Sequence, residues 1–148
     1  MTYQRIISTN DSDIPYLSSI LQLTDVSKFI RIDESNYWNY VTQTENVFYY
    51  KVFLNNELVA STHCEISNKT LYMDIMVIPQ HQRKGIATSI LSDIMSGKLQ
   101  LDFDKIEVSI DEQNIASIKL FEKMNFKFVS KEDELLNYTY SLTKETNI

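Results

Sequence analysis

Apolar residues follow two different spacings near the middle of the chain, and each predicts a different element. Leu71 to Ile78 is an almost unbroken apolar run, typical of a buried strand, and Pro79 marks the turn that ends it. Shortly afterwards, Ile86, Ile90 and Ile94 recur every four residues, which predicts the apolar face of a helix. The two patterns therefore predict a strand–turn–helix junction.

The remaining apolar patterns predict further strands and helices along the whole chain. The other predicted strands are Tyr3–Ser8, Val47–Leu54, Glu57–Ile66, Lys105–Ile110, Phe126–Ser130 and Leu136–Leu142, and the other predicted helices are Asp13–Leu23, Glu34–Gln43 and Asn114–Met124. Asp33 or Ser35 is the expected cap of the second of these helices. We expect an α+β fold, a mixed sheet flanked by helices, in a single domain over residues 1–148.

Composition narrows the class of protein. The chain has 148 residues, 43% of them hydrophobic, which suits one globular domain with a sizeable core. No apolar stretch reaches the ~18 residues of a membrane span, no signal peptide pattern is present, and Cys64 is the single cysteine. We therefore expect a cytoplasmic protein without disulfides or membrane contact. The net charge of −6 disfavours nucleic acid and suits a cationic substrate such as an amine.

The junction itself carries candidate chemistry. Gly85 is one of only two glycines and lies at the expected start of the helix, two residues before Ala87. Small residues allow a ligand to approach the backbone closely. The first turn of a helix has free N–H groups and the positive end of the helix dipole, both of which favour an anion. The sequence therefore predicts a phosphate site here.

Two common phosphate motifs are excluded. A P-loop needs a glycine where Gln80 stands, and its lysine follows the second glycine, whereas Lys84 precedes Gly85. The dinucleotide fingerprint needs three glycines after a strand, and the junction has only one.

The stretch from Val77 to Thr88 resembles the acyl-CoA site of the GNAT superfamily of N-acetyltransferases. Its signature is Gln/Arg-x-x-Gly-x-Gly/Ala at the start of a helix, after a strand that ends in Val-x-Pro. This chain has Val-Ile-Pro at residues 77–79 and Gln-Arg-Lys-Gly-Ile-Ala at residues 82–87. A second segment, residues 108–126, resembles the later strand and helix of the family, with Asn114 as N-cap and Asn125 in place of the family's helix-ending glycine.

The resemblance implies a fold and a cosubstrate. It implies a mostly antiparallel sheet of six to seven strands with about four helices, splayed between the fourth and fifth strands, and acetyl-CoA as cosubstrate without a metal. Residues 82–88 would hold the pyrophosphate, and Met76 and Val77 would offer main-chain groups to the pantetheine and the thioester. The cofactor residues implied are Met76, Val77, Gln82, Arg83, Lys84, Gly85, Ile86, Ala87, Thr88, Asn114, Ser117 and Phe121.

Catalysis needs a base, and Asp74 is the first candidate because it interrupts an otherwise apolar strand. It matches the aspartate of a Glu-Asp-x-x-Val pattern in small-amine acetyltransferases of the family, with Met73 replacing the glutamate. A structural role for Asp74 is the competing interpretation, and Glu65 is the second candidate. Alternation along the strand places Cys64 on the face opposite Glu65, which argues against a cysteine nucleophile.

The proton donor to the departing thiolate is open. The family often uses a tyrosine where this chain has Phe121, so water, the proton released by the amine, Tyr138 or Tyr140 could take that role. Phe121 itself is expected to pack in the core.

The sequence thus predicts an N-acetyltransferase in which a primary amine attacks the thioester directly. The amine is a small molecule or a peptide N-terminus, and residues 37–40 and 48–50 are expected to form an aromatic wall for it. A homodimer is left open. The alternative is a module that binds or senses acyl-CoA without turnover.

Overall fold

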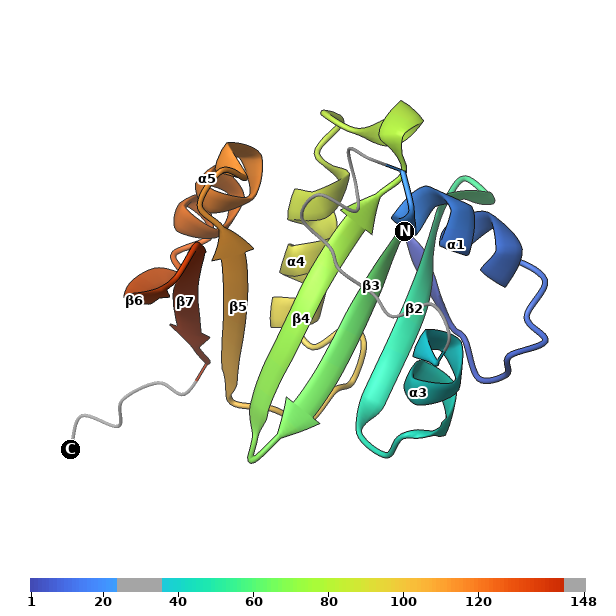
Figure 1. Cartoon of the computed structure of the whole chain (residues 1–148), viewed down its shortest axis with the longest axis horizontal. Helices are drawn as coiled ribbons and strands as arrows, with labels where there is room; N and C mark the ends of the chain where they lie inside the picture. The colour runs from blue at the N-terminus through green and yellow to red at the C-terminus, as the bar shows by residue number, and fades with distance from the viewer. Residues whose placement is uncertain (24–35, 143–148) are drawn as a thin grey trace.

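The computed structural model describes residues 1–23 and 36–142, which form one sheet with helices packed on its faces (Figure 1). The strands are β1 (Thr2–Arg5), β2 (Val47–Leu54), β3 (Glu57–Ser67), β4 (Thr70–Val77), β5 (Lys105–Asp111), β6 (Lys127–Glu132) and β7 (Leu135–Ser141), and the helices are α1 (Ile14–Leu21), α3 (Tyr37–Gln43), α4 (Ile86–Met95) and α5 (Ile115–Lys123). A short 3₁₀ helix, Pro79–His81, separates β4 from α4. No helix in this part of the chain is long and apolar enough to cross a membrane.

The sheet order is β1-β2-β3-β4-β5-β7-β6, and every neighbouring pair is antiparallel except β4 and β5. The parallel pair is short, because only Thr70 to Tyr72 pair with Lys105 to Glu107. Beyond Tyr72 the two strands diverge, as Figure 1 shows. The predicted α+β fold, its mixed sheet and the splay between the fourth and fifth strands are therefore confirmed.

Element boundaries differ from the prediction mainly at the N-terminus. The first strand ends at Arg5 rather than Ser8, although the Ile6 N–H still donates to Tyr49 O at 2.8 Å. The helix predicted over residues 13–23 spans Ile14–Leu21, and the following one is described from Tyr37. Its predicted start at residue 34 and both candidate caps, residues 33 and 35, lie outside the described residues.

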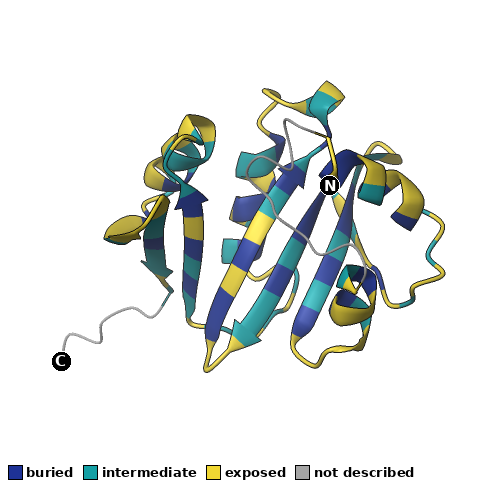
Figure 2. Ribbon diagram, viewed as in Figure 1, coloured by how far each residue is buried: buried dark blue, intermediate teal, exposed yellow. Residues whose placement is uncertain are grey.

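Two apolar clusters lie on opposite faces of the sheet, as alternation along β4 requires. Figure 2 shows how buried and more exposed residues alternate along the strands. Leu71 and Met73 pack with α4, where Ile90 and Ile94 are almost completely buried. Each such isoleucine contributes about 1.5–3 kcal/mol through burial. Met76 lies on the opposite face of the strand and packs with residues of α1 and α3. The buried apolar residues of β4 therefore face one helix layer or the other, whereas Tyr72 and Asp74 are exposed.

Candidate functional site

The turn before α4 has the geometry of an anion site. Gly85 adopts φ of +76° and is the N-cap of the helix, a left-handed conformation in which a glycine carries no Cβ penalty. The first i to i−4 hydrogen bond of α4 runs from Ser89 N–H to Gly85 O at 3.1 Å. The N–H groups of residues 86–88 precede that bond, so they have no acceptor within the helix. They can bind the oxygens of a phosphate.

The residues predicted for the pyrophosphate lie in one exposed segment. Gln82, Arg83, Lys84 and Gly85 are all exposed, and Arg83 has φ of 63°. A Cβ built on Gly85 would meet no atom within 4 Å, so the backbone there is open to a ligand. A hollow of about 340 Å³ borders this turn, with Lys84 and Gly85 among its lining residues.

The pairing of β4 with β3 sets the direction in which the main-chain groups of Val77 and Met76 point. Ile78 N–H donates to Val59 O at 2.9 Å, and hydrogen-bonded pairs alternate along an antiparallel ladder. The main-chain groups of Met76 therefore point toward β3, and those of Val77 point toward β5, where the sheet is splayed. Gln82 Nε2 donates to Val77 O at 3.2 Å, which brings two predicted cofactor residues together. The geometry favours Val77 over Met76 for main-chain contact with a pantetheine arm.

Helix α5 borders the other side of the splay. Asn114 Oδ1 accepts from Ser117 N–H at 3.2 Å, which confirms the predicted N-cap. Asn125 has φ of 70° and ends the helix as the left-handed residue, also as predicted. Phe121 is buried and packs edge-on against Phe126 with ring centroids 5.0 Å apart, so core packing is confirmed for this residue.

Asp74 lies on β4 two residues beyond Tyr72, where pairing with β5 ends. It shares the face of Met76 and is exposed to solvent. Desolvation by the surrounding protein nevertheless raises the pKa of Asp74, while the charge and main-chain N–H of His63 lower it and the charge of Glu65 raises it. The carboxylate thus meets solvent yet is poorly hydrated, which makes it a stronger base than an ordinary aspartate.

Glu65 belongs to a hydrogen-bonded chain on the same face. Tyr40 Oη donates to Glu65 Oε1 at 2.5 Å, and this bond raises the pKa of Tyr40 to about 12. Glu65 Oε2 lies 2.6 Å from His63 Nε2, and Tyr37 Oη lies 2.7 Å from His63 Nδ1. Both oxygens of Glu65 therefore have partners, which makes Asp74 the freer of the two candidate bases. The described residues contain no group of three or more His, Cys, Asp or Glu side chains placed to hold a metal.

Two further residues considered from the sequence, Cys64 as a nucleophile and Tyr138 as a proton donor, are buried. Cys64 is completely buried on the opposite face, as alternation predicted, and burial raises the pKa of its thiol to about 12. Tyr138 is also buried and donates to Glu122 Oε2 at 2.8 Å. Burial and that bond raise the pKa of Tyr138. Neither group is placed to exchange a proton readily.

The predicted aromatic wall was wrong for Phe48 and Tyr50, two of its six aromatic residues. Tyr37, Trp38 and Tyr49 do pack edge-on to one another, with ring centroids 5.0–6.0 Å apart. Phe48 and Tyr50, however, point to the α4 face, because residues of β2 alternate in direction.

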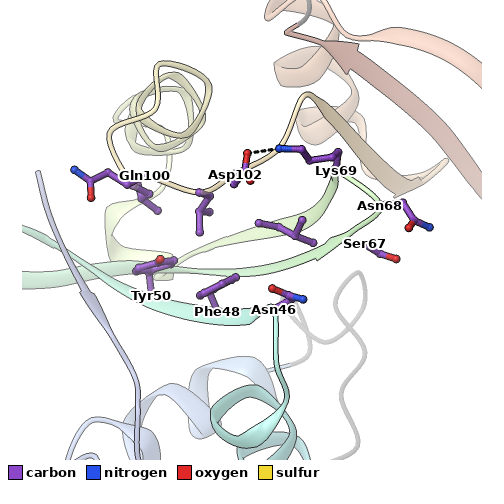
Figure 3. Close-up of a pocket in the computed structure, with 11 residues that line it drawn as sticks. Asn46, Phe48, Tyr50, Ser67, Asn68, Lys69, Gln100 and Asp102 are labelled. Atoms are coloured by element: carbon purple, nitrogen blue, oxygen red, sulfur yellow. Dashed lines mark hydrogen bonds and ion pairs between the residues drawn. The ribbon is translucent and has the colours of Figure 1, made fainter.

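Phe48 and Tyr50 help to line a separate hollow of about 720 Å³, shown in Figure 3. Its rim includes Lys69, whose Nζ donates to Asp102 Oδ1 at 2.5 Å. It also takes in residues 99–102, which follow the C-terminal end of α4, so it lies at the end of the helix opposite Gly85. This hollow is not part of the candidate site.

Comparison with known proteins shows which family and which solved structures the chain resembles. A sequence model described as "Acetyltransferase (GNAT) family" matches residues 15–126. Comparison with curated protein sequences finds no match.

Several of the solved structures similar to the chain are N-acetyltransferases, all at low sequence identity. Campylobacter jejuni N-acetyltransferase PseH in complex with acetyl coenzyme A is 12% identical, covers 96% of this chain and 99% of its own, and has a TM-score of 0.77. The ribosomal-protein-S18-alanine N-acetyltransferase from Escherichia coli is 16% identical, covers 99% of this chain and 97% of its own, and has a TM-score of 0.74. Spermidine N-acetyltransferase from Vibrio cholerae in complex with CoA and spermine is 12% identical, covers 95% of this chain and 95% of its own, and has a TM-score of 0.79. At these identities the likeness shows the shared fold.

Proposed function

The chain belongs to the GNAT acetyltransferase family, and from that premise we propose that it transfers an acetyl group from acetyl-CoA to a primary amine. One observation carries the proposal: a left-handed Gly85 presents unpaired helix N–H groups beside the place where β4 and β5 diverge. We propose that residues 1–148 act as a single domain in the cytoplasm. A homodimer stays a prediction.

The residues of the turn fit the cosubstrate. The N–H groups at the start of α4 would bind the pyrophosphate, with Arg83 and Lys84 adding positive charge. Main-chain groups of Val77 face the splay and would hold the pantetheine arm after Gln82 releases the Val77 carbonyl. Acetyl-CoA supplies a thioester carbon that an amine nitrogen attacks, and the C–S bond then breaks to release the thiol.

Asp74 would act on the acceptor. An alkylamine with a pKa of ~10.4 is neutral in about one molecule per few thousand at pH 7, so reaching the neutral form costs about 4–5 kcal/mol. The Asp74 carboxylate would take the proton from the ammonium group, directly or through water, and leave a nucleophilic nitrogen. Overall, an ammonium and the thioester give an amide, the thiol and one proton. Water or the proton released by the amine is the proposed donor to the thiolate, because Phe121 has no acidic proton.

The acceptor is proposed to be a small-molecule amine or a peptide N-terminus. The similar solved structures include both classes: one is a spermidine N-acetyltransferase, and another is a ribosomal-protein-S18-alanine N-acetyltransferase. The acidic net charge of the chain, −6, suits either cation.

We expect acetyl-CoA and CoA to raise the melting temperature, because a ligand that binds only the native state stabilises it by mass action. At 100 times the Kd the gain is about 2.7 kcal/mol. Differential scanning fluorimetry with acetyl-CoA, ATP and NAD in parallel measures it. Stabilisation by ATP or NAD without stabilisation by CoA would show that the turn binds a different ligand.

The alternative, a module that senses acyl-CoA without turnover, is favoured by Phe121 and Met73, which replace residues that the family often uses in chemistry. Release of free thiol separates the two functions. An enzyme releases thiol from acetyl-CoA faster when a suitable amine is added, whereas a sensor releases it at the slow rate of thioester hydrolysis with every amine tested.

A further inference from the structure

One titratable group next to the candidate base has no part in the mechanism proposed so far. The side chain of His63 is 13% exposed, and both of its ring nitrogens have partners. Nδ1 lies 2.7 Å from Tyr37 Oη and Nε2 lies 2.6 Å from Glu65 Oε2. The ring is thus fixed from two sides by residues of α3 and β3.

This arrangement holds the ring in either protonation state. Burial raises the pKa of Tyr37, so the phenol keeps its proton. With neutral His63, the Tyr37 hydroxyl donates to Nδ1 and the Nε2–H donates to Glu65. With protonated His63, both nitrogens donate, and the phenol oxygen accepts from Nδ1. The imidazole can therefore gain or lose a charge without changing its position.

His63 stands directly opposite Asp74 across the β3–β4 pair. Side chains so paired share a face, with Cβ atoms about 4.5–5.5 Å apart, and Glu65 is the diagonal neighbour of Asp74 at about 7–8 Å. Other titratable or charged groups near this face, among the described residues, are Tyr37 and Tyr40 of α3, Tyr49 and Lys51 of β2, Tyr72 of β4, and Asp11 and Asp13 before α1. Lys51 is bound to Asp11 and Asp13 at 2.9 and 2.8 Å, so its charge is compensated. Among the described residues, His63 is then the group that can place a positive charge opposite Asp74.

We propose that His63 is a positioning residue for the base: its imidazolium, held by Tyr37 and Glu65, keeps the carboxylate of Asp74 ionised beside the acceptor amine. The proposal rests on the proposed function of Asp74. Without a neighbouring cation, a poorly hydrated carboxylate next to Glu65 would take up a proton before an amine could use it. His63 extends the working range of the base toward lower pH and does not itself touch the substrate.

The first test is the pH dependence of kcat in the variant His63→Gln. Glutamine retains polar contacts but carries no charge, so the acidic limb of the profile should move upward by about one pH unit, the lower end of the effect of an opposite charge within ~4–6 Å. The KM for acetyl-CoA should not change. His81→Gln is the matched control, because His81 also contacts a glutamate, Glu57, at 3.1 Å but lies in the 3₁₀ helix. The acidic limb of the pH profile of His81→Gln should lie at the same pH as that of the wild type.

The variant His63→Lys supplies the converse test, since it restores a positive charge without an aromatic ring. Its acidic limb should lie at or below the wild-type pH, whatever its kcat. An acidic limb that is the same in the glutamine, lysine and wild-type proteins overturns the proposal.

A measurement on the wild-type protein requires neither a variant nor turnover. Carbon-13 NMR of the Asp74 side-chain carboxyl should show, besides its own titration, a smaller shift at the pH where the His63 ring loses its proton. A single-step titration of Asp74 overturns the proposal. If no amine is acetylated but the two-step titration is found, then the proposed function fails and the coupling of His63 to Asp74 stands.

Discussion

Replacing Gly85 with Glu is expected to abolish acetyl-CoA binding and to leave the protein folded. The new carboxylate would stand at the N-terminus of α4, where a phosphate should bind, and would repel it. We expect the Kd for acetyl-CoA to rise about 100-fold or more, which is about 2.7 kcal/mol or more. Isothermal titration calorimetry measures the Kd, and circular dichroism tests the fold.

Gly97 provides a matched control for this substitution. Its φ of 87° is close to the 76° of Gly85, and a Cβ at either position meets no atom within 4 Å. Each variant to Glu therefore costs about 1–2 kcal/mol in backbone strain and adds the same charge. Gly97→Glu should bind acetyl-CoA as the wild type does. Equal loss of affinity in both variants, or none in Gly85→Glu, would place the ligand elsewhere.

Replacing Asp74 with Asn is expected to lower kcat about 10²–10⁴-fold at neutral pH, the usual contribution of a general base. The acidic limb of the pH–rate profile should disappear, because the group that titrates has been removed. Affinity for acetyl-CoA should survive, since Asn is nearly isosteric. Steady-state kinetics across pH, with calorimetry as the control for binding, gives both quantities. A variant that unfolds, or one with an unchanged pH profile, would favour a structural role for Asp74.

The same variant should be more stable than the wild type at neutral pH. The folded protein raises the pKa of Asp74 above its unfolded value of about 3.9, so ionising Asp74 costs more in the folded state. Asp74 therefore contributes stability to the wild-type protein while it is protonated. This contribution is fully present below the unfolded pKa and is lost as pH rises through the folded pKa. Asn does not ionise, so the melting temperature of Asp74→Asn relative to wild type should increase as the pH rises from about 4 through the raised pKa of folded Asp74. A constant difference would mean that Asp74 has an ordinary pKa.

Features encoded within a few residues of sequence were predicted well. The four-residue repeat of isoleucines fixes the face of α4, Asn114 caps α5 through its own side chain, and Asn125 supplies the left-handed end. Glycine after a basic pair at a strand–helix junction predicts an anion site from equally local features, and anion binding there stays a prediction. In each case the atoms that interact lie within one or two turns of chain.

Features that depend on distant contacts could not be predicted. Tyr37 and His63 are 26 residues apart, and only the packing of α3 on β3 brings the phenol to the ring. Alternation along β3 places Glu65 on the face opposite Cys64, but it does not show that both oxygens of Glu65 have partners. The aromatic run at residues 48–50 suggested one wall, although strand alternation alone separates Tyr49 from its neighbours.

The fate of the acetyl group is the most direct test of acetyl transfer to an amine. The protein is incubated with acetyl-CoA carrying a carbon-13 label and with a panel of small amines and short peptides, and the products are analysed by mass spectrometry. We predict that labelled acetyl groups appear on the nitrogen of at least one amine in amounts equal to the thiol released, and at a rate greatly reduced in Asp74→Asn. Thiol release matched only by labelled acetate, with every amine unmodified, would contradict this account.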